Sequence, residues 1–359
     1  MMSNVAIVTV LPHLKDYFTH EHIEFYARLM ITMPSLAIAF LAPFLGHLIH
    51  KIGKKVSAIF ALLLFSIAGS AGLYLDSIES LLASRAFLGI AIAILMIVST
   101  ALVGDYFSDE KRNKYMGLQN AFISLGGVLF VVGGGVLSDI NWRYSFTIYL
   151  IGFALLFFVL KYLVEFKSTQ LASEENSEDI PTKLYKIYIL AFIYMAIFYI
   201  LPTQMPFLMI NHFNASGTMT GMVISLALLF NGIGALSFSK LKKSFNFFQI
   251  YLIGLIIIAF GFIAVYFANN IYILFLIAPA FGFGGGLLMT SVTAWMLSLA
   301  HHTKRVKSSG YLTSSLFMGQ FFSPILTMPI VAHFGVQSFF LVIGVVLLIG
   351  AIGAFIIKR

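Results

Sequence analysis

The sequence predicts an all-α polytopic membrane protein built from two six-helix bundles, with about twelve transmembrane helices of which the first is incomplete. Three observations support this fold class. Of the 359 residues, 60% are hydrophobic and only 10% are charged, against roughly 25% charged residues in ordinary soluble domains. Apolar runs of about 20 residues recur along the whole chain. Basic residues gather in every second connection between these runs.

The first apolar stretch, from Val5 to Leu14, is too short to span a bilayer. We interpret it as the outer end of a first helix, with the start site of the chain placed inside that helix. Alternatively, it is a helix that enters the bilayer only part-way. Eleven full-length spans are predicted after it, near residues 28–49, 55–75, 80–104, 115–138, 144–164, 186–211, 219–239, 247–268, 271–298, 310–333 and 337–357.

The distribution of Lys and Arg predicts the orientation of the spans. Eighteen of the 22 basic residues lie in connections on one side or at the C-terminus. The other side holds Lys15, Arg28 and Arg143, and Arg85 falls inside a span. Because basic residues near span ends stay in the cytoplasm, we expect a multi-pass protein of the cytoplasmic (inner) membrane with its C-terminus and central loop in the cytoplasm. The net charge of +8 then reflects topology, and no nucleic-acid partner is expected.

One connection differs in composition from the rest. Residues 165–183 are polar and acidic and have no apolar face. They divide the chain into an N-terminal helix bundle (1–164), a cytoplasmic linker (165–183) and a C-terminal helix bundle (184–359). Two halves of similar length are typical of transporters whose bundles are related by an axis along the membrane normal.

The connection after the second span reads GHLIHKIGKK. It resembles the loop signature of the major facilitator superfamily, Gly-x-Leu-x-Asp-Arg-x-Gly-Arg-Lys, with matches at Gly46 and Gly53 and a retained charge at Lys51. His50 stands where the family has Asp. The resemblance implies a gating role for this loop together with Asp105, which matches the family's acidic position after the fourth span. A histidine lacks the carboxylate charge that favours a helix N-terminus, so we expect a weakened latch; the alternative is a short basic turn.

Further motifs follow in the family's order. Arg85 precedes Gly89 by four residues, as in the family pattern Arg-x-x-x-Gly, and residues 141–146 resemble the Trp-Arg-x-x-Phe segment that opens the sixth helix. The fifth span has the glycine spacing of the antiporter signature, but Phe130 and Val131 replace its Gly-Pro pair. The resemblance therefore implies a major-facilitator-type fold along nearly the whole chain and leaves antiport open.

Arg85 is interpreted as the only basic residue inside a span. Because an unpaired charge is costly in a bilayer, we expect it to face the central cavity; the alternative is an arginine held by backbone carbonyls or by a neighbouring helix. No Asp or Glu lies in the middle of a predicted span. The candidates for proton coupling are therefore Arg85, His13 and Asp16, and the alternative for His13 is a solvated interfacial side chain.

Polar and aromatic residues near mid-span are candidates for lining a substrate cavity: Asn120, Gln204, Asn231, Trp295, Gln320 and Ser323. Gln204 lies between Pro202 and Pro206, which predicts a break or kink in the seventh helix because proline removes backbone hydrogen bonds. The alternative for the amides is hydrogen bonding between packed helices.

The family resemblance implies a secondary active transporter that works by alternating access, and it favours proton-coupled efflux of drugs or small metabolites. One alternative is an uptake permease for a sugar- or nucleoside-like solute. Another is an inactive or scaffold-like truncated relative. We expect no enzyme activity, no catalytic residues, no cofactor and no metal site. The expected partners are a small-molecule substrate, protons as the candidate coupling ion, and the lipid bilayer, and the protein is expected to be a monomer.

Overall fold

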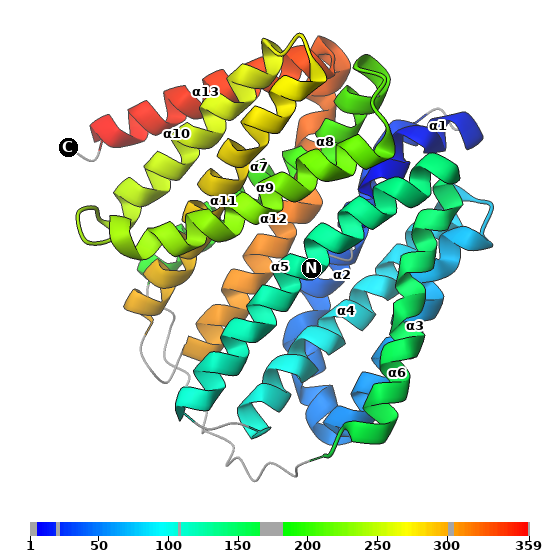
Figure 1. Ribbon diagram of the computed structural model, residues 1–359. Coiled ribbons are helices and arrows are strands. Elements are labelled where there is room, and N and C mark those ends of the chain that lie inside the picture. The colour runs from blue at the N-terminus through cyan, green and yellow to red at the C-terminus, as the bar shows by residue number, and fades with distance from the viewer. Residues whose placement is uncertain (1–5, 19–21, 107–108, 166–181, 301–304, 358–359) are drawn as a thin grey trace.

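The computed structural model describes residues 6–18, 22–106, 109–165, 182–300 and 305–357, and in these residues it is an array of helices without strands (Figure 1). In chain order the elements are η2 (Val8–His13), α1 (Leu14–Tyr17), α2 (Ile23–Ile52), α3 (Lys54–Gly69), η3 (Ser70–Leu73), α4 (Ile78–Tyr106), α5 (Asp109–Ile140), η4 (Trp142–Leu150), α6 (Ile151–Tyr162), α7 (Thr182–Phe198), α8 (Ile200–Phe207), η5 (Leu208–His212), α9 (Gly217–Leu241), α10 (Phe247–Tyr266), α11 (Ile271–Leu299), α12 (Arg305–Phe334) and α13 (Val336–Ile357).

The predicted spans correspond to these helices. Within the described residues, ten helical segments are long and apolar enough to cross a membrane, and α5 adds a shorter apolar helix over Leu125–Ile140. The sixth span starts at Trp142 as the 3-10 helix η4 and continues as α6, so the Trp-Arg-x-x-Phe segment does open it. The all-helical fold class is thus confirmed, since each long apolar run forms a helix that satisfies its own backbone groups.

The helices form two groups. In the first half α2 and α3 pack on α4, and in the second half α11 packs on α9 and α10, with α13 against α10. The halves meet where α5 packs on α9 and α2 packs on α12. We call the helix ends that adjoin the lysine-rich connections the basic end, and the opposite ends the distal end. In Figure 1 the distal ends of α5 and α9 lie together at the upper right, whereas the basic ends of α6 and α13 lie far apart.

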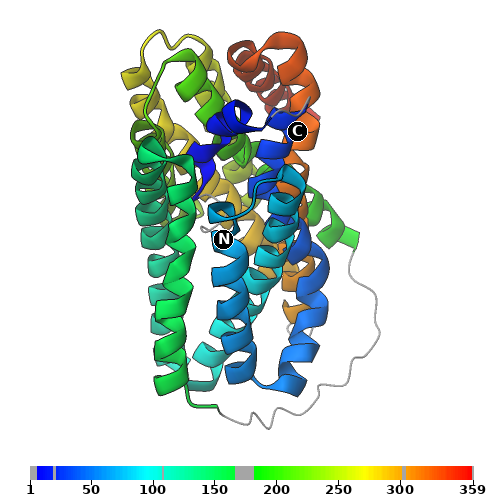
Figure 2. The same cartoon turned by 90° about the vertical axis from the view of Figure 1, so that its right-hand side faces the viewer.

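In the short first segment, η2 is buried between the two halves at the distal end (Figure 2), whereas Asp16 and Tyr17 of α1 are exposed. Ile7, Val8, Val10 and Leu11 are at most 1% exposed. The segment contacts α5 and η4 of the first half and α8 and α9 of the second. These apolar side chains therefore belong to the interface between the halves.

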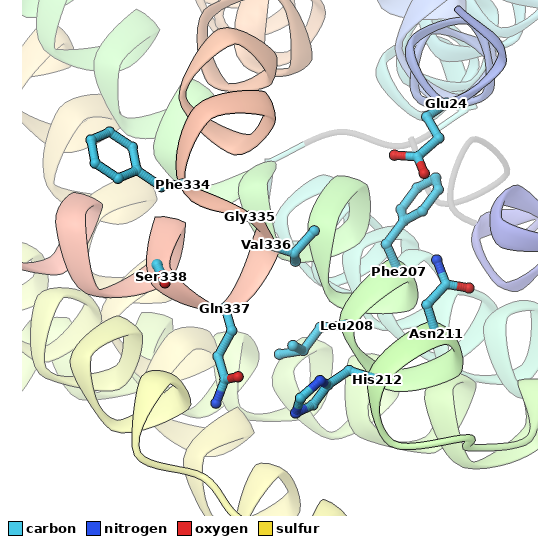
Figure 3. A pocket seen from close by; sticks show the side chains of 10 residues that line it. All are labelled: Glu24, Phe207, Leu208, Asn211, His212, Phe334, Gly335, Val336, Gln337 and Ser338. Atoms are coloured by element: carbon cyan, nitrogen blue, oxygen red, sulfur yellow. The ribbon is translucent and has the colours of Figure 1, made fainter.

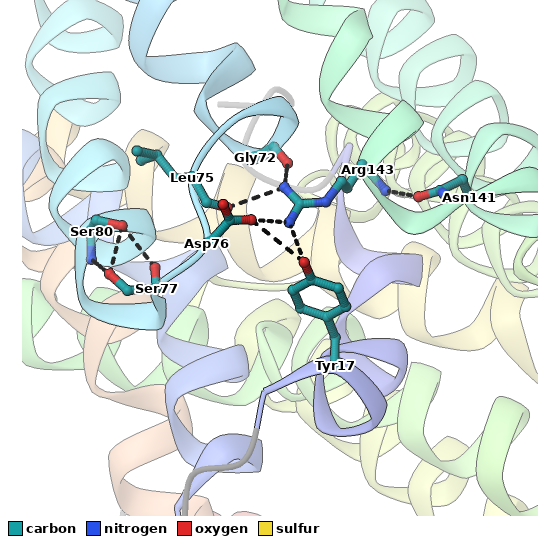
Figure 4. Close-up of polar contacts among 8 residues, drawn as sticks. All are labelled: Tyr17, Gly72, Leu75, Asp76, Ser77, Ser80, Asn141 and Arg143. Atoms are coloured by element: carbon teal, nitrogen blue, oxygen red, sulfur yellow. Dashed lines mark hydrogen bonds and ion pairs between the residues drawn. The ribbon is translucent and has the colours of Figure 1, made fainter.

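Arg143 ties this segment to the rest of the first half (Figure 4). Its guanidinium donates to the carbonyls of Gly72 (2.9 Å) and Leu75 (3.1 Å), to the Tyr17 hydroxyl (2.9 Å) and to the carboxylate of Asp76 (2.5 Å). Its Cζ also lies 5.0 Å from the centre of the Tyr17 ring. One side chain thus joins the start of η4 to the end of α1 and to the connection that follows η3, through charge-assisted hydrogen bonds, which are the stronger kind.

Replacing Arg143 with methionine is expected to lower the free energy of unfolding by about 2 kcal/mol, because several hydrogen bonds to a charged group are lost. Unfolding in mixed detergent micelles, followed by circular dichroism, measures the change. Lys186→Met is the control, because Lys186 is exposed on α7. Equal stability of the two variants would contradict a structural role for Arg143.

Candidate functional site

A helix break positions the polar residues of the seventh span. The predicted break occurs at Tyr199, between α7 and α8, and η5 then continues as a π-helix beyond Pro206. The prolines account for this, because each removes a backbone donor from the helix. Every residue of α8 is buried, including Gln204.

Gln204 of the second half contacts Arg28 of the first. Arg28 is fully buried, and its Nε donates to Gln204 Oε1 at 3.1 Å. Its Nη1 donates to both the carbonyl (3.0 Å) and the carboxylate (3.1 Å) of Glu24, one turn earlier in α2. The Phe207 ring lies flat against it, with Cζ 3.7 Å from the ring centre, a cation–π geometry. The guanidinium therefore forms a charged link between the two halves.

The position of Arg28 corrects the prediction that Arg85 is the only basic residue inside a span. The apolar run of the predicted span begins at residue 28, which puts Arg28 in a connection. In the structure α2 begins five residues earlier, at Ile23, and the segment Ile23–Ala42, which is long and apolar enough to cross a membrane, contains Arg28. Its counter-charge one turn away, Glu24, makes this burial tolerable.

The link continues into α12. Gln204 Nε2 donates to Thr327 Oγ1 at 3.1 Å, and Thr327 Oγ1 donates to the carbonyl of Ser323 at 2.9 Å. Ser323 Oγ in turn donates to the carbonyl of Ala196 in α7 at 2.7 Å. Two predicted lining residues, Gln204 and Ser323, thus lie in one hydrogen-bonded seam that ends at Arg28.

A second link between the halves lies at the distal tips of α5 and α9. The Asp139 carboxylate accepts hydrogen bonds from the backbone N–H groups of Gly217 and Thr218 and from the Thr218 hydroxyl. A carboxylate is favoured at a helix N-terminus because free N–H groups and the helix dipole both point to it. At Gly135, an added Cβ would lie 2.4 Å from the carbonyl oxygen of Gly217, so the two helices touch backbone to backbone. Sequence reasoning missed Asp139, because its partner is 78 residues away.

Arg85 lies within the first half and is 1% exposed. Its Nη2 donates to the carbonyls of Ala68 (3.1 Å) and Gly69 (2.6 Å) at the end of α3. Its Cζ lies 5.0 Å and 5.2 Å from the ring centres of Phe146 and Tyr149. This arrangement is the alternative considered for Arg85, an arginine held by backbone carbonyls and a neighbouring helix.

The other coupling candidates lie in the first segment. His13 ends η2 and is partly buried, and its Nε2 has no hydrogen-bond partner among the described residues. Asp16 in α1 is exposed. In the described part of the chain neither residue is bonded to Arg28 or Arg85.

In the loop signature, Gly53 separates α2 from α3 with a φ of 98°, a conformation that favours glycine. The Glu165 carboxylate, at the end of the sixth span, accepts from the backbone N–H groups of Lys54 and Lys55 at the start of α3. Lys51 is exposed. Gly46, His50, Asp105 and Asn120 fall on helices, but nothing beyond their backbone lies within the described residues, so the gating role of the loop with Asp105 stays a prediction.

The remaining lining candidates are spread through the second half. Asn231 approaches the phenol of Tyr194, and both amide atoms of buried Gln320 lack a hydrogen bond that satisfies normal geometry, although the Tyr199 hydroxyl approaches it. Trp295 lies near the basic end of α11, where it stacks on Phe247 at a centroid distance of 6.1 Å. The structure therefore brings Gln204 and Ser323 together and leaves Trp295 apart from them.

A crevice of about 270 Å³ lies on the distal side of the Arg28 link (Figure 3). Its walls come from the start of α2, from α8 and η5, and from the turn between α12 and α13. Glu24, Phe207, Asn211, His212 and Gln337 are among its lining residues. Among the described residues, no cluster of His, Asp or Glu could hold a metal ion.

Curated relatives match parts of the chain. Multidrug resistance protein 3 of Bacillus subtilis is 31% identical over 125 residues, which are 34% of this chain and 24% of that protein. The arabinose-proton symporter of Escherichia coli is 29% identical over 142 residues, 39% of this chain and 28% of that protein. The matches thus span about a quarter of the length of these relatives.

Solved structures match the whole fold. A bacterial homolog of the human lysosomal transporter Spinster, in an inward-facing and occupied conformation, superposes with a TM-score of 0.81 at 16% identity and covers 100% of this chain and 94% of that chain. A POT family transporter in complex with a peptide gives 0.76 at 13% identity, with 99% and 94% covered. At these identities the likeness shows the fold alone. The sequence profile of the Major Facilitator Superfamily matches residues 1–187 and 187–359. The chain therefore belongs to the Major Facilitator Superfamily.

Proposed function

We propose that this chain is a secondary active transporter that works by alternating access and exports drugs or small metabolites in exchange for protons. The observation that carries the proposal is the pair of links at Arg28 and Asp139, which join the two halves at the distal end. Both links lie within a few residues of the helix tips. Hydrogen bonds of this kind can be broken and remade when the two bundles rock. In this proposal the structure represents the state closed at the distal end.

The distal end faces outward in this proposal, and the basic end, the linker and the C-terminus face the cytoplasm of the cell that makes the protein. The excess of basic residues at one end supports this orientation. The chain has no cysteine, so single cysteines introduced at Lys54, Lys242 and Lys307 can be labelled individually. All three should react only from the cytoplasmic side, and labelling on opposite sides would contradict the arrangement.

Export of apolar cargo is favoured by the predicted lining residues, whose side chains are uncharged amide, hydroxyl and aromatic groups, because uncharged sites bind mainly through apolar area with few orienting polar groups. The multidrug resistance relative supports the same direction. Uptake of a sugar-like solute is the second candidate, supported by the similarity to an arabinose-proton symporter.

Counterflow in reconstituted vesicles distinguishes the candidates. Lipophilic drugs, pentoses and nucleosides are tested separately, with and without a pH gradient, and vesicles without protein serve as the control. Exchange of drugs that a pH gradient accelerates supports the proposal. Exchange of pentoses alone supports the uptake permease, and failure of every substrate supports an inactive relative.

Among the coupling candidates we propose His13 as the proton carrier, because its Nε2 is free of a hydrogen-bond partner within the described residues. His13→Asn is expected to reduce transport driven by a pH gradient by at least about a hundredfold, the lower end of the range for a lost proton-transfer group, while counterflow persists. Asp16→Asn tests the other candidate of the same segment and is expected to leave gradient-driven transport unchanged, because Asp16 is exposed. Unchanged gradient-driven transport in both variants would eliminate both residues.

A further inference from the structure

The closure at Arg28 depends on a single counter-charge. The Arg28 side chain is 0% exposed, and in the described part of the chain its only ion pair is with Glu24, whose side chain is 44% exposed. The Nη2 atom of Arg28 is buried without a partner there. Removing one member of a buried ion pair is strongly unfavourable, because it leaves an uncompensated charge. Loss of the negative charge of Glu24 is therefore expected to destabilise the buried guanidinium of Arg28 and its bond to Gln204.

The two members of this pair differ in their access to water. Glu24 lies on the wall of the distal crevice shown in Figure 3, so a proton from the solution at that end can reach its carboxylate. Arg28 is sealed beneath the Phe207 ring. The pair thus connects an accessible titratable group to a buried contact between the halves.

We infer that Glu24 is a proton-binding site which controls closure of the distal end. Protonation removes the negative charge beside Arg28, weakens the bond from Arg28 to Gln204 and shifts the protein toward the state that is open at the distal end. The direction follows from linkage, because a closed state that requires the carboxylate must be disfavoured when a proton binds. This inference rests on the proposed alternation between states.

The effect of Glu24 has to be distinguished from the effects of the other titratable or charged groups on α2 and on the elements around it. They are His22 and Arg28 on α2, His13 and Asp16 on η2 and α1, His212 on η5, and His333 near the end of α12. Among them, in the described residues, only Arg28 forms an ion pair with Glu24. His212 is the histidine that lines the same crevice.

Pulsed electron–electron double resonance on the full chain in lipid nanodiscs tests the inference without any substrate. Spin labels at Ser77→Cys and Asn269→Cys report the distance between the halves, because both positions are exposed in distal connections. Lowering the pH from about 8 to about 4 is expected to raise the ratio of open to closed states about tenfold, within the usual range of coupling between a bound ligand and a conformational equilibrium. Glu24→Gln should be open at both pH values.

Matched variants make the result specific. Glu79→Gln removes an exposed carboxylate in the first turn of α4, at the same end, and should keep the wild-type pH response. His212→Asn and His333→Asn should also keep it. A wild-type pH response in Glu24→Gln, or its loss in His212→Asn or His333→Asn, would overturn the inference. If Arg28→Met opened the distal end but pH did not change the distance in the wild-type protein, the role of Glu24 would be refuted while that of Arg28 remained. A distance that no variant and no pH changes would also contradict the proposed alternation.

Discussion

Replacing Gly135 with valine is expected to hold the distal ends of α5 and α9 apart and to reduce transport strongly. At this position a Cβ would lie 2.4 Å from the carbonyl oxygen of Gly217, which is a backbone atom and can move only if the helix moves. Forcing extra atoms into a packed contact costs about 1–3 kcal/mol, which is roughly a 5- to 150-fold change in the ratio of closed to open states.

Gly133 provides a matched control two residues away on the same helix. An added Cβ there would meet no atom within 4 Å, so Gly133→Val carries the same change in helix propensity without the clash. We compare the two variants by their closed populations, measured from distal spin-label distances, and by their rates of counterflow. The difference between them isolates the contact with Gly217. If Gly135→Val and Gly133→Val had closed states of equal population, α5 and α9 would not need to touch for the distal end to close.

Replacing Arg28 with methionine is the second change with a large expected effect. Methionine fills a similar apolar volume but leaves Gln204 Oε1 buried without its donor, and an unsatisfied buried acceptor costs about 1–3 kcal/mol. We expect the population open at the distal end to rise by roughly 5- to 150-fold. Exchange that requires closure at that end should fall in parallel.

Arg85→Met is the comparison, since Arg85 is equally buried but is bonded to carbonyls of its own half. It should lower the stability of the first half in denaturation experiments while the distance between the halves in folded protein stays unchanged. If Arg85→Met abolished gradient-driven transport without loss of stability, the prediction that Arg85 takes part in proton coupling would be supported. An unchanged distance in Arg28→Met would instead remove Arg28 from the distal closure.

The fold was predictable because it follows from two local features of the sequence, the length of each apolar run and the placement of Lys and Arg between the runs. The break in the seventh helix was also predictable, since Pro202 and Pro206 remove backbone donors wherever they stand in a helix. Tyr199, where the break occurs, lies three residues before the first of these prolines. The boundary itself depends on packing in the second half, which hydropathy does not report.

The links between the halves were not predictable in the same way. Arg28 was assigned to a connection because a charge ends an apolar run, although Glu24 four residues earlier was a signal that a buried pair could extend the helix. Asp139 gave no such signal, because an acidic residue at the end of a span is common. Its partner, Gly217, is distant in the sequence and lies at the start of α9. Arg85 was predicted to lie inside a span and to face the central cavity, whereas the fold places it against the carbonyls of α3, which was the alternative.

The buried first segment has a mechanical consequence for a protein whose halves rock. Its side chains facing α5, α8 and α9 are mainly aliphatic, and Thr9 Oγ1 within it has no hydrogen-bond partner among the described residues. Sliding of one half along this surface exchanges one set of van der Waals contacts for another and breaks no directional bond there. The segment therefore offers the halves an apolar surface along which they can slide, whereas the polar bonds that would have to break lie elsewhere, at Arg28, Asp139, Ser225 and Ser314.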